Sequence, residues 1–259
     1  MALPRIIAIA SQKGGVAKTT TCVSLGASLA EQDKHVLLVD LDPQAHLTLS
    51  LGLEPEGLGH TVADAVMGNA SLASISRETN VPFLHLAPAS EKLSVVDKWL
   101  YGRANYEHLV KNRLDTLPSE RYDVILMDSP PSFGTLMLNA LTAAELLVIP
   151  TPCEYYASRS LRRVLQLVRL VREKTNPMLA YRVLITMFDP SDQTAHMIRE
   201  QMESAFSGGL LATVIEVDAK LRESAIARLP ITLYAPLARG AAQYRALAQE
   251  LMNYERRRT

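Results

Sequence analysis

Short apolar runs alternate along this chain with longer segments in which apolar residues recur at helical spacing. Runs such as Ile6 to Ala10 and Val36 to Val39 are continuously apolar, which is typical of strands buried on both faces. The segment from Thr19 to Glu31 instead places Ala, Leu and Val at helical spacing. The predicted strands are 6–10, 36–39, 83–87, 124–127, 146–149, 183–187 and 211–215. The predicted helices are 19–31, 61–68, 72–77, 134–144, 160–174, 194–206 and 241–254, and 91–117 is expected to be mostly helical.

Strands separated by helices in this order predict a parallel sheet that is covered by helices on both faces. No internal repeat, low-complexity segment or linker rich in Gly, Pro or Ser divides the chain. We therefore expect one domain over residues 1–259, with the fold class α/β and a single doubly wound, mostly parallel sheet.

Composition excludes some classes of protein and weakens others. Hydrophobic residues make up 48% of the chain and charged residues 21%, which are ordinary globular values and argue against disorder. The 27 basic residues equal the 27 acidic ones, so the chain lacks the basic surplus that is usual in non-specific DNA binders. Cys22 and Cys153 share no metal-ligand spacing and are expected to be thiols in a reducing cytoplasm. No signal peptide and no transmembrane segment is predicted.

A glycine-containing segment follows the first predicted strand and opens the first predicted helix, which is the context that a phosphate-binding loop needs. Glycines let backbone N–H groups turn toward phosphate oxygens, and the helix N-terminus presents further amides to the same anion. Lys18 is placed to reach the β- and γ-phosphates of a nucleotide, and the Thr19 hydroxyl is a candidate magnesium ligand. The predicted nucleotide-binding residues of this loop are Lys13, Gly14, Gly15, Val16, Ala17, Lys18, Thr19 and Thr20.

Two features of this loop depart from the usual phosphate loop. Ala17 stands directly before Lys18, where the usual loop carries glycine. Lys13 stands directly before the loop, where its side chain is expected to project outward and not to cradle the chain's own nucleotide. We expect Lys13 to contact a phosphate held by a second subunit.

With these features, Lys13 to Thr20 resembles the deviant Walker A box of the ParA/MinD family of P-loop ATPases. The resemblance extends over almost the whole chain and is closest to the ParA/Soj chromosome and plasmid partition ATPases. It implies the P-loop NTPase fold, ATP and Mg²⁺ as cofactors, and ATP hydrolysis. The other segments that carry it are Asp40 to Gln44, Ile125 to Ser132, Cys153 to Tyr156, Ile185 to Met187, and Leu233 to Ala241.

Carboxylates at the ends of predicted strands supply the remaining candidate chemistry. Asp42 and Asp128 follow apolar strands, at the edge where α/β sheets bind ligands. Asp128 is expected to hold magnesium through water, together with Thr19 and Asp42. The family resemblance places the residue that orients the attacking water at Asp42, so Lys13, Lys18 and Asp42 are the expected catalytic residues. Asp40 is expected to support the magnesium shell, and a role as a turn or helix-cap residue is the alternative.

The adenine end of the site departs from the family pattern, which often has Pro-Arg-Asn in the loop after a late strand. This chain reads Glu216-Val217-Asp218 at that place. Asp218 is a candidate acceptor for the adenine amino group, and Met187 is a candidate to pack on the ring. Ordinary loop and core roles are the alternative for Glu216, Asp218 and Met187.

The resemblance implies an ATP-dependent homodimer that binds DNA without sequence preference and is released when a cargo-bound partner of the ParB type stimulates hydrolysis. A cytoplasmic location with nucleoid association follows from it. Val217 and Ser191 stand where the family carries basic residues for DNA. Lys220, Arg222 and Arg228 are the candidate substitute patch. Further basic clusters are Arg159, Arg162, Arg163, Arg169 and Arg172, and the tail Arg256, Arg257 and Arg258.

Two other functions compete with DNA positioning. A MinD-like membrane protein needs an amphipathic C-terminal helix, and Tyr244, Leu247, Leu251 and Tyr254 form an apolar stripe for which we favour core packing. A nitrogenase-type iron protein needs two cysteines after the Walker motifs, and Cys22 lies in the first helix, which counts against it. A protein cargo in place of DNA is a further alternative.

Overall fold

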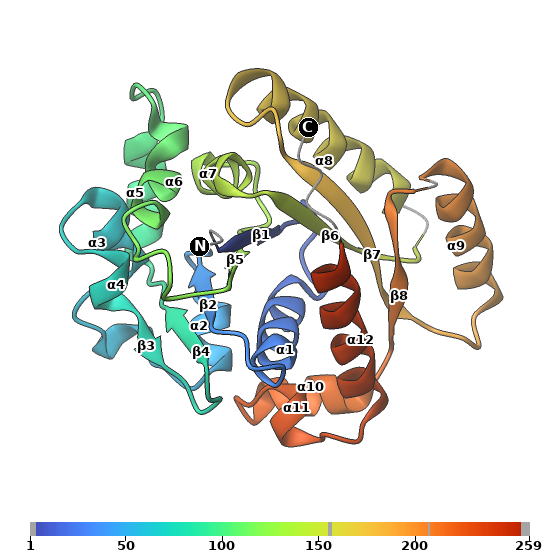
Figure 1. Cartoon of the computed structure of the whole chain (residues 1–259). Helices are drawn as coiled ribbons and strands as arrows, with labels where there is room; N and C mark the ends of the chain where they lie inside the picture. Colours follow the sequence, from blue (N-terminus) through green and yellow to red (C-terminus); the bar gives the residue numbers. More distant parts are fainter. Residues whose placement is uncertain (1–3, 155–156, 207, 255–259) are drawn as a thin grey trace.

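A computed structural model of the chain describes residues 4–154, 157–206 and 208–254. Its centre is an eight-stranded sheet in the order β3-β4-β2-β5-β1-β6-β7-β8 (Figure 1). Neighbouring strands run parallel except for the short β3, which pairs antiparallel with β4. The strands are β1 (Arg5–Ile9), β2 (Val36–Asp40), β3 (Arg77–Glu78), β4 (Leu84–Ala87), β5 (Val124–Asp128), β6 (Leu146–Pro152), β7 (Ala180–Phe188) and β8 (Leu210–Glu216). The expected doubly wound α/β fold is confirmed.

The helices cover both faces of this sheet, as the buried residues show. One core packs α1, α2, α11 and α12 against the sheet, and the other packs α3 to α9 against the opposite face. Figure 1 shows α1 and α12 lying side by side on the first face. The helices are α1 (Lys18–Ala30), α2 (His46–Ser50), α3 (Val62–Met67), α4 (Leu72–Ile75), α5 (Lys92–Leu100), α6 (Leu109–Leu114), α7 (Thr135–Ala143), α8 (Ala157–Lys174), α9 (Gln193–Ala205), α10 (Ala219–Ile226), α11 (Ile231–Tyr234) and α12 (Arg239–Asn253).

Strand alternation explains how one continuous apolar run serves two cores. Ile7 and Ile9 of β1 belong to the core under α1 and α12, whereas Ala8 between them belongs to the opposite core. Successive side chains of a strand point to opposite faces, so a strand covered on both sides needs apolar residues at every position. This is why β1, β2 and β5 contain no polar residue between their first and last positions.

Several predicted elements differ from the observed ones. The segment 91–117 is not one mostly helical stretch, because α5 ends at Leu100 and a 3-10 turn at Tyr106–His108 precedes α6. Gly102 lies between them with φ +80°, a left-handed conformation that stops a helix and that glycine adopts without strain. The helix predicted over 72–77 ends at Ile75, and Arg77–Glu78 form β3 instead. The prediction missed α2, α10 and α11.

The order of the strands aligns several loops at one edge of the sheet. Ile9 at the end of β1 pairs with Asp128 at the end of β5, and Asp40 at the end of β2 pairs with the same Asp128. The carboxyl ends of these central strands therefore lie at the same level. Ligands of open α/β sheets bind at this edge, so the fold places the loop after β1 beside the carboxylates that follow β2 and β5.

Candidate functional site

The loop between β1 and α1 has the backbone conformation of an anion-binding turn. Gly15 adopts φ +70° and Ala17 adopts φ +67°, both in the left-handed region. Ala17 is the N-cap residue of α1, and no side chain caps the helix. The first amides of α1 are therefore available to an anion, and the helix dipole favours one there. A left-handed alanine costs of order 1–3 kcal/mol, which the usual glycine at this position would avoid.

A threonine from β7 holds this loop from inside the protein. The Thr186 hydroxyl donates to the carbonyl of Val16 at 3.2 Å, and both residues are buried. A buried carbonyl without a partner is costly, so this bond fixes the loop conformation directly before Ala17. The sequence alone does not indicate this role, because nothing in the spacing of Ile185 to Met187 relates Thr186 to the loop.

Lys18 is directed toward the predicted phosphate position. It is buried, and its ammonium group donates to the carbonyl of Lys13 at 3.2 Å, on the other side of the loop. Burial lowers the pKa of Lys18, while the charges of Asp128 and Asp42 oppose that effect. A desolvated cation enclosed by a glycine loop is suited to bind phosphate oxygens, which would supply the negative charge that it lacks.

Asp128 and Thr19 form the candidate magnesium site. The Thr19 hydroxyl donates to Asp128 Oδ2 at 2.6 Å. Asp128 Oδ1 is buried and has no hydrogen-bond partner among the described residues. Burial, followed by the charge of Asp40, raises the pKa of Asp128 to about 8. An unpartnered buried carboxylate oxygen beside a threonine hydroxyl fits a divalent cation, whose charge would offset the burial of this carboxylate.

Asp40 has the contacts of a turn residue, which is the alternative to its expected place in the magnesium shell. Its Oδ1 accepts from the backbone N–H of Asp42 at 3.0 Å, and its Oδ2 accepts from the N–H and the hydroxyl of Thr48 at 2.9 and 2.7 Å. Both oxygens thus hold the turn between β2 and α2. Burial raises the pKa of Asp40 to about 7, although the Thr48 bonds oppose that rise. The structure gives Asp40 a positioning role for the loop that carries Asp42.

Asp42 lies on this loop with part of its carboxylate engaged. Its Oδ1 accepts from the backbone N–H of Gln44 at 2.9 Å, which forms a tight turn after β2. The residue is buried near Lys18, and its charge opposes the lowering of the Lys18 pKa by burial. Asp42 therefore belongs to the same cluster as Lys18, Thr19 and Asp128.

Lys13 forms an ion pair within its own chain. Its ammonium group contacts Glu154, which lies just beyond the end of β6. Both side chains are partly exposed, so the expected outward direction of Lys13 is compatible with this contact. To reach a phosphate of another subunit, Lys13 would have to leave Glu154.

The predicted base end lies where β7 and β8 finish. Met187 has φ +52° and sits in an irregularity of the β7–β8 pairing, which leaves its side chain exposed at this edge. The backbone N–H of Val217 donates to the carbonyl of Phe188 at 2.9 Å and brings the next loop beside Met187. The structure thus places Met187 and the loop from Glu216 to Asp218 together.

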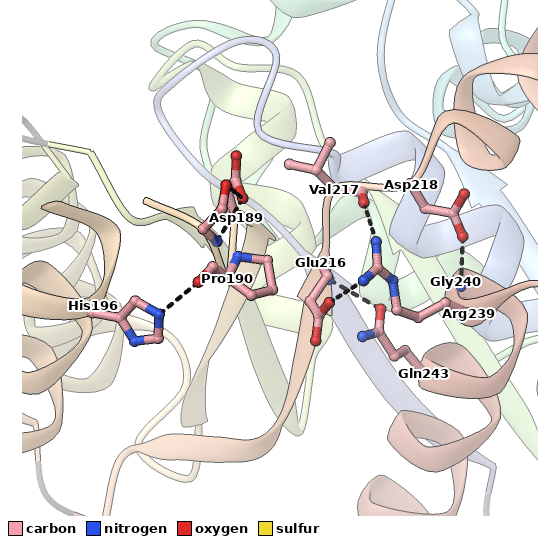
Figure 2. Close-up of polar contacts among 10 residues, drawn as sticks. Asp189, Pro190, His196, Glu216, Val217, Asp218, Arg239, Gly240 and Gln243 are labelled. Atoms are coloured by element: carbon pink, nitrogen blue, oxygen red, sulfur yellow. Dashed lines mark hydrogen bonds and ion pairs between the residues drawn. The ribbon is translucent and has the colours of Figure 1, made fainter. Parts of the chain in front are cut away.

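The carboxylates of this loop already have structural partners. Asp218 Oδ1 accepts from the N–H of Lys220 as the N-cap of α10, and its Oδ2 accepts from the N–H of Gly240 at 2.9 Å. Glu216 forms an ion pair with Arg239, and Figure 2 shows the Arg239 guanidinium between Glu216 and the Val217 carbonyl. An adenine contact by the Asp218 carboxylate would compete with these two caps. The alternative role of Asp218 as a loop residue therefore gains a physical basis.

A cavity of about 1430 Å³ lies at the opposite, amino-terminal edge of the strands, lined by residues that include Arg5, Glu145 and Tyr254. None of the predicted site residues lines it. Phosphate-binding loops of parallel sheets lie at the carboxyl ends of strands, so this cavity is not the nucleotide site. No group of three or more His, Cys, Asp or Glu residues that could hold a metal is found in the described part of the chain. A magnesium ion at Asp128 would therefore need oxygen ligands from phosphate and water.

Comparisons with known proteins agree with this geometry. Residues 4–181 match the family described as an AAA domain. The chain is 40% identical to the sporulation initiation inhibitor protein Soj of Bacillus subtilis, over 95% of this chain and 98% of that protein. It is 36% identical to the chromosome partitioning protein ParA of Myxococcus xanthus, over 96% of this chain and 88% of that protein. The chain belongs to the ParA/MinD family of P-loop ATPases.

A solved structure shows that the similarity extends to the fold of this ParA/MinD-family ATPase. It is described as cobyrinic acid a,c-diamide synthase from Mycobacterium smegmatis with a bound ATP analogue and magnesium. The sequence identity is 34%, the TM-score is 0.87, and the alignment covers 96% of this chain and 94% of that one. The expected P-loop NTPase fold is therefore confirmed by an independent structure.

The candidate DNA-binding residues of this ParA/MinD-family ATPase are partly neutralised. Lys220 pairs with Glu223 at 2.7 Å, and Arg228 pairs with Glu54. Arg222 is exposed on α10 and has no ion-pair partner among the described residues. Figure 2 shows the loop at Asp189 and Pro190, which precedes Ser191, beside the loop of Val217, so the two loops that lack the family's basic residues are neighbours. The tail Arg256, Arg257 and Arg258 lies outside the described residues.

The two competing functions find little support. Tyr244, Leu247 and Leu251 of the C-terminal stripe are fully buried against the sheet, which confirms core packing. Within the residues that the structure describes, no helix combines the length and apolar character that crossing a bilayer requires. Cys22 is also fully buried, and burial raises its pKa, so its thiol has the character of a core residue.

Proposed function

We propose that this ATPase is an ATP-switched positioning protein that forms a homodimer with ATP and segregates DNA, either a chromosome or a plasmid. ATP and Mg²⁺ would bind at the loop from Lys13 to Thr20. The observation that carries the proposal is the joint presence of Lys13 before the loop and the unpartnered Asp128 oxygen beside Thr19. Lys13, once it leaves Glu154, is a cation that could contact the nucleotide of a second copy. The unpartnered Asp128 oxygen is part of a site that a divalent ion would complete.

The chemistry that the site supports is attack of water on the γ-phosphorus of ATP. The bond from that phosphorus to the oxygen bridging to the β-phosphate breaks, and ADP and phosphate leave. Asp42 orients the attacking water, and Lys18 together with the α1 amides balances charge on the phosphate oxygens. Magnesium at Thr19 and Asp128 supplies further positive charge when it is bound. Lys13 of the partner copy adds a second cation, so hydrolysis requires the dimer.

DNA is the proposed track, and a cargo-bound protein of the ParB type is the proposed stimulator. The identities to ParA and Soj support this choice. A dimer doubles each exposed basic patch on one rigid body, which allows Arg222 and its neighbours to act together although the chain is neutral. A protein cargo in place of DNA is favoured by one observation, namely that Lys220 and Arg228 are already paired with acidic side chains.

Amide synthesis, the activity for which the Mycobacterium smegmatis neighbour is named, is not extended to this chain. An amide synthase that takes nitrogen from glutamine through a cysteine nucleophile needs a reactive thiolate. Both cysteines are buried, and burial raises the pKa of Cys153 to about 11 and raises that of Cys22 well above its ordinary value. Neither thiol is suited to that role.

The experiment that tests the proposal uses Asp42→Ala, which should bind ATP and dimerise but not hydrolyse. Removing a group that positions water affects the transition state more than the ground state. Sedimentation with ATP and magnesium should give a dimer, and a gel shift at low salt should show binding to any duplex. Normal hydrolysis by Asp42→Ala would show that Asp42 is misassigned. A stable dimer that shifts no duplex would reject DNA in favour of a protein track.

A further inference from the structure

The cavity at the amino-terminal edge of the sheet has the lining of a ligand-binding site. Its volume is about 1430 Å³, which exceeds the roughly 300–1,000 Å³ that is usual for small-molecule pockets. It extends from the ends of α6 and α7, past the beginnings of β1, β6 and β7, to the end of α12. None of its described lining residues belongs to the predicted nucleotide site, so the function proposed above leaves this cavity without a role.

One part of the lining is apolar. The sheet and α6, with the turn after it, contribute the side chains of Ile6, Ile125, Leu146, Leu114 and Leu117. An apolar wall that faces a cavity is not covered by another element of the protein, so an apolar group that enters displaces water from it. This part of the cavity therefore suits a hydrocarbon or aromatic body.

Two arginines add positive charge to the same cavity. Arg172 comes from the last turn of α8, and Arg182 belongs to β7. Neither side chain forms an ion pair within residues 4–154, 157–206 and 208–254. Both guanidinium groups therefore keep a charge that a ligand could complement.

The other charged residues of the lining balance one another. Lys111 pairs with Asp115 at 3.0 Å, one helical turn away. Arg5 and Glu145 contribute one charge of each sign. The described lining thus has four basic residues against two acidic ones, and its excess of positive charge corresponds to the two arginines without an acidic partner. An anion is the ligand that matches this excess.

Main-chain carbonyls hold both guanidinium groups near the start of β7. Arg172 Nε donates to the carbonyl of Leu179 at 2.7 Å, and Arg182 Nη1 donates to the carbonyl of Tyr181 at 2.8 Å. Carbonyls of alternate residues in an extended strand point the same way and are about 6.6 Å apart. Each guanidinium makes this one hydrogen bond among the described residues, so its other N–H groups are available to a ligand.

Tyrosine rings of the lining contact the same two guanidinium groups. The Arg172 guanidinium lies 5.8 Å from the centre of the Tyr181 ring, and that of Arg182 lies 4.3 Å from the centre of the Tyr254 ring. Such cation–π contacts restrict the rotamers of a long side chain before a ligand arrives. Less conformational entropy is then lost on binding, which favours the use of these arginines as ligand contacts.

We propose that this cavity is a second ligand-binding site, which takes an amphipathic organic anion. The apolar body lies against the wall that contains Leu114, and the acidic group lies at Arg172 and Arg182. A guanidinium binds a carboxylate, sulfonate or phosphate through paired N–H donors, which gives the site its preference for an anion. The site is separate from the phosphate-binding loop, so the inference does not depend on the proposed function.

Anilinonaphthalene sulfonate is a suitable probe because it joins aromatic rings to a single sulfonate. We would titrate it into the whole chain and follow its fluorescence, with calorimetry for the stoichiometry. Phenylnaphthylamine has the same rings without the sulfonate and serves as the uncharged comparison. We expect one saturable site per chain, with the uncharged probe bound roughly tenfold more weakly. Saturating ATP and magnesium should leave the sulfonate bound, because the phosphate-binding loop lies at the other edge of the sheet.

Two substitutions and a matched control locate the probe. Arg172→Gln and Arg182→Gln should each weaken binding of the sulfonate roughly five- to tenfold. Both variants should bind the uncharged probe as before, which also shows that the cavity is intact. The control is Arg169→Gln, because Arg169 is an exposed arginine of the same helix as Arg172 but does not line the cavity. This control should bind both probes normally.

Each of the other outcomes overturns the inference. Displacement of the sulfonate by ATP and magnesium would place the probe in the nucleotide site. Equal affinity for the two probes would show an apolar crevice without preference for an anion. An equal loss of affinity in Arg169→Gln would place the probe on the outer surface of α8. Absence of saturable binding would reject the site altogether, while ATP hydrolysis by the same samples tests the proposed function separately.

Discussion

The ion pair between Lys13 and Glu154 predicts a change that should strengthen dimerisation. In the structure Lys13 is held by a carboxylate of its own chain, whereas the proposed mechanism requires it at the nucleotide of the partner. Glu154→Gln removes the charge that competes for Lys13 and keeps the size of the side chain. The variant should therefore form the ATP-dependent dimer at lower protein concentration.

The size of the effect follows from the exposure of the pair. The two side chains are 37% and 47% exposed, so solvent screens their attraction. Exposed pairs contribute about 0.2–1 kcal/mol, and a dimer breaks one pair in each copy. The expected gain of about 0.4–2 kcal/mol tightens the dimer roughly two- to thirtyfold. At about 1 M salt, where charges are screened within roughly 3 Å, most of this gain should disappear.

Sedimentation velocity with a non-hydrolysable ATP analogue measures the dimer dissociation constant. The matched control is Glu203→Gln, which breaks an ion pair with Arg199 on α9 whose side chains are 37% and 50% exposed. The control should dimerise like the unmodified chain. A weaker dimer in Glu154→Gln would refute the reasoning, because it would show that Glu154 contributes to the interface instead of restraining Lys13.

Three further substitutions and one chemical modification test separate parts of the molecule. Lys18→Ala should weaken ATP binding by about ten- to a hundredfold in a calorimetric titration, since a charge-assisted bond to phosphate is lost, and unchanged affinity would contradict its assignment. Thr186→Val should cost about 1–3 kcal/mol of unfolding free energy in urea, because the Val16 carbonyl loses a buried partner, and a neutral result would show that water replaces the hydroxyl. Arg222→Glu should weaken binding to all duplexes about equally in gel shifts and leave ATP binding intact, whereas loss on selected sequences would indicate base readout. The alkylation rate of Cys153 should keep rising with pH up to its pKa of about 11. The rate for an exposed thiol would instead level off near pH 9.

The arrangement of the proposed phosphate-binding residues could be predicted because each of the segments that carry them can be recognised locally in the sequence. The loop from Lys13 to Thr20 lies between a strand and a helix, and Asp42 and Asp128 follow apolar strands that the fold brings to one edge. Strand ends of a parallel sheet meet at the same edge whatever the loops between them contain. The proximity of Thr19 to Asp128 follows from this rule, although the residues are distant in the chain.

The contacts that could not be predicted depend on how side chains from distant loops pair. Asp40 bonds to Thr48 and to its own turn, and no spacing in the sequence distinguishes such an acceptor from a magnesium ligand. Asp218 follows a strand by two residues, as Asp42 does, yet it caps two helices. The helices α2 and α11 were missed because four or five residues are too few to show a helical period.

The hydrogen bond from Thr186 to Val16 has a consequence for the nucleotide selectivity of the proposed site. The Thr186 hydroxyl donates a hydrogen bond to the phosphate-binding loop at Val16. The next residue, Met187, lies at the proposed base end of the site. One strand therefore contacts the phosphate-binding loop and also reaches the proposed base end, so a shift of β7 at one of these places would move the other. Inorganic triphosphate has no base, so it would make no contact at the proposed base end of the site. Recognition of the purine and of the phosphate chain would then be inseparable, so a change that relaxed the choice of base would also loosen the hold on phosphate.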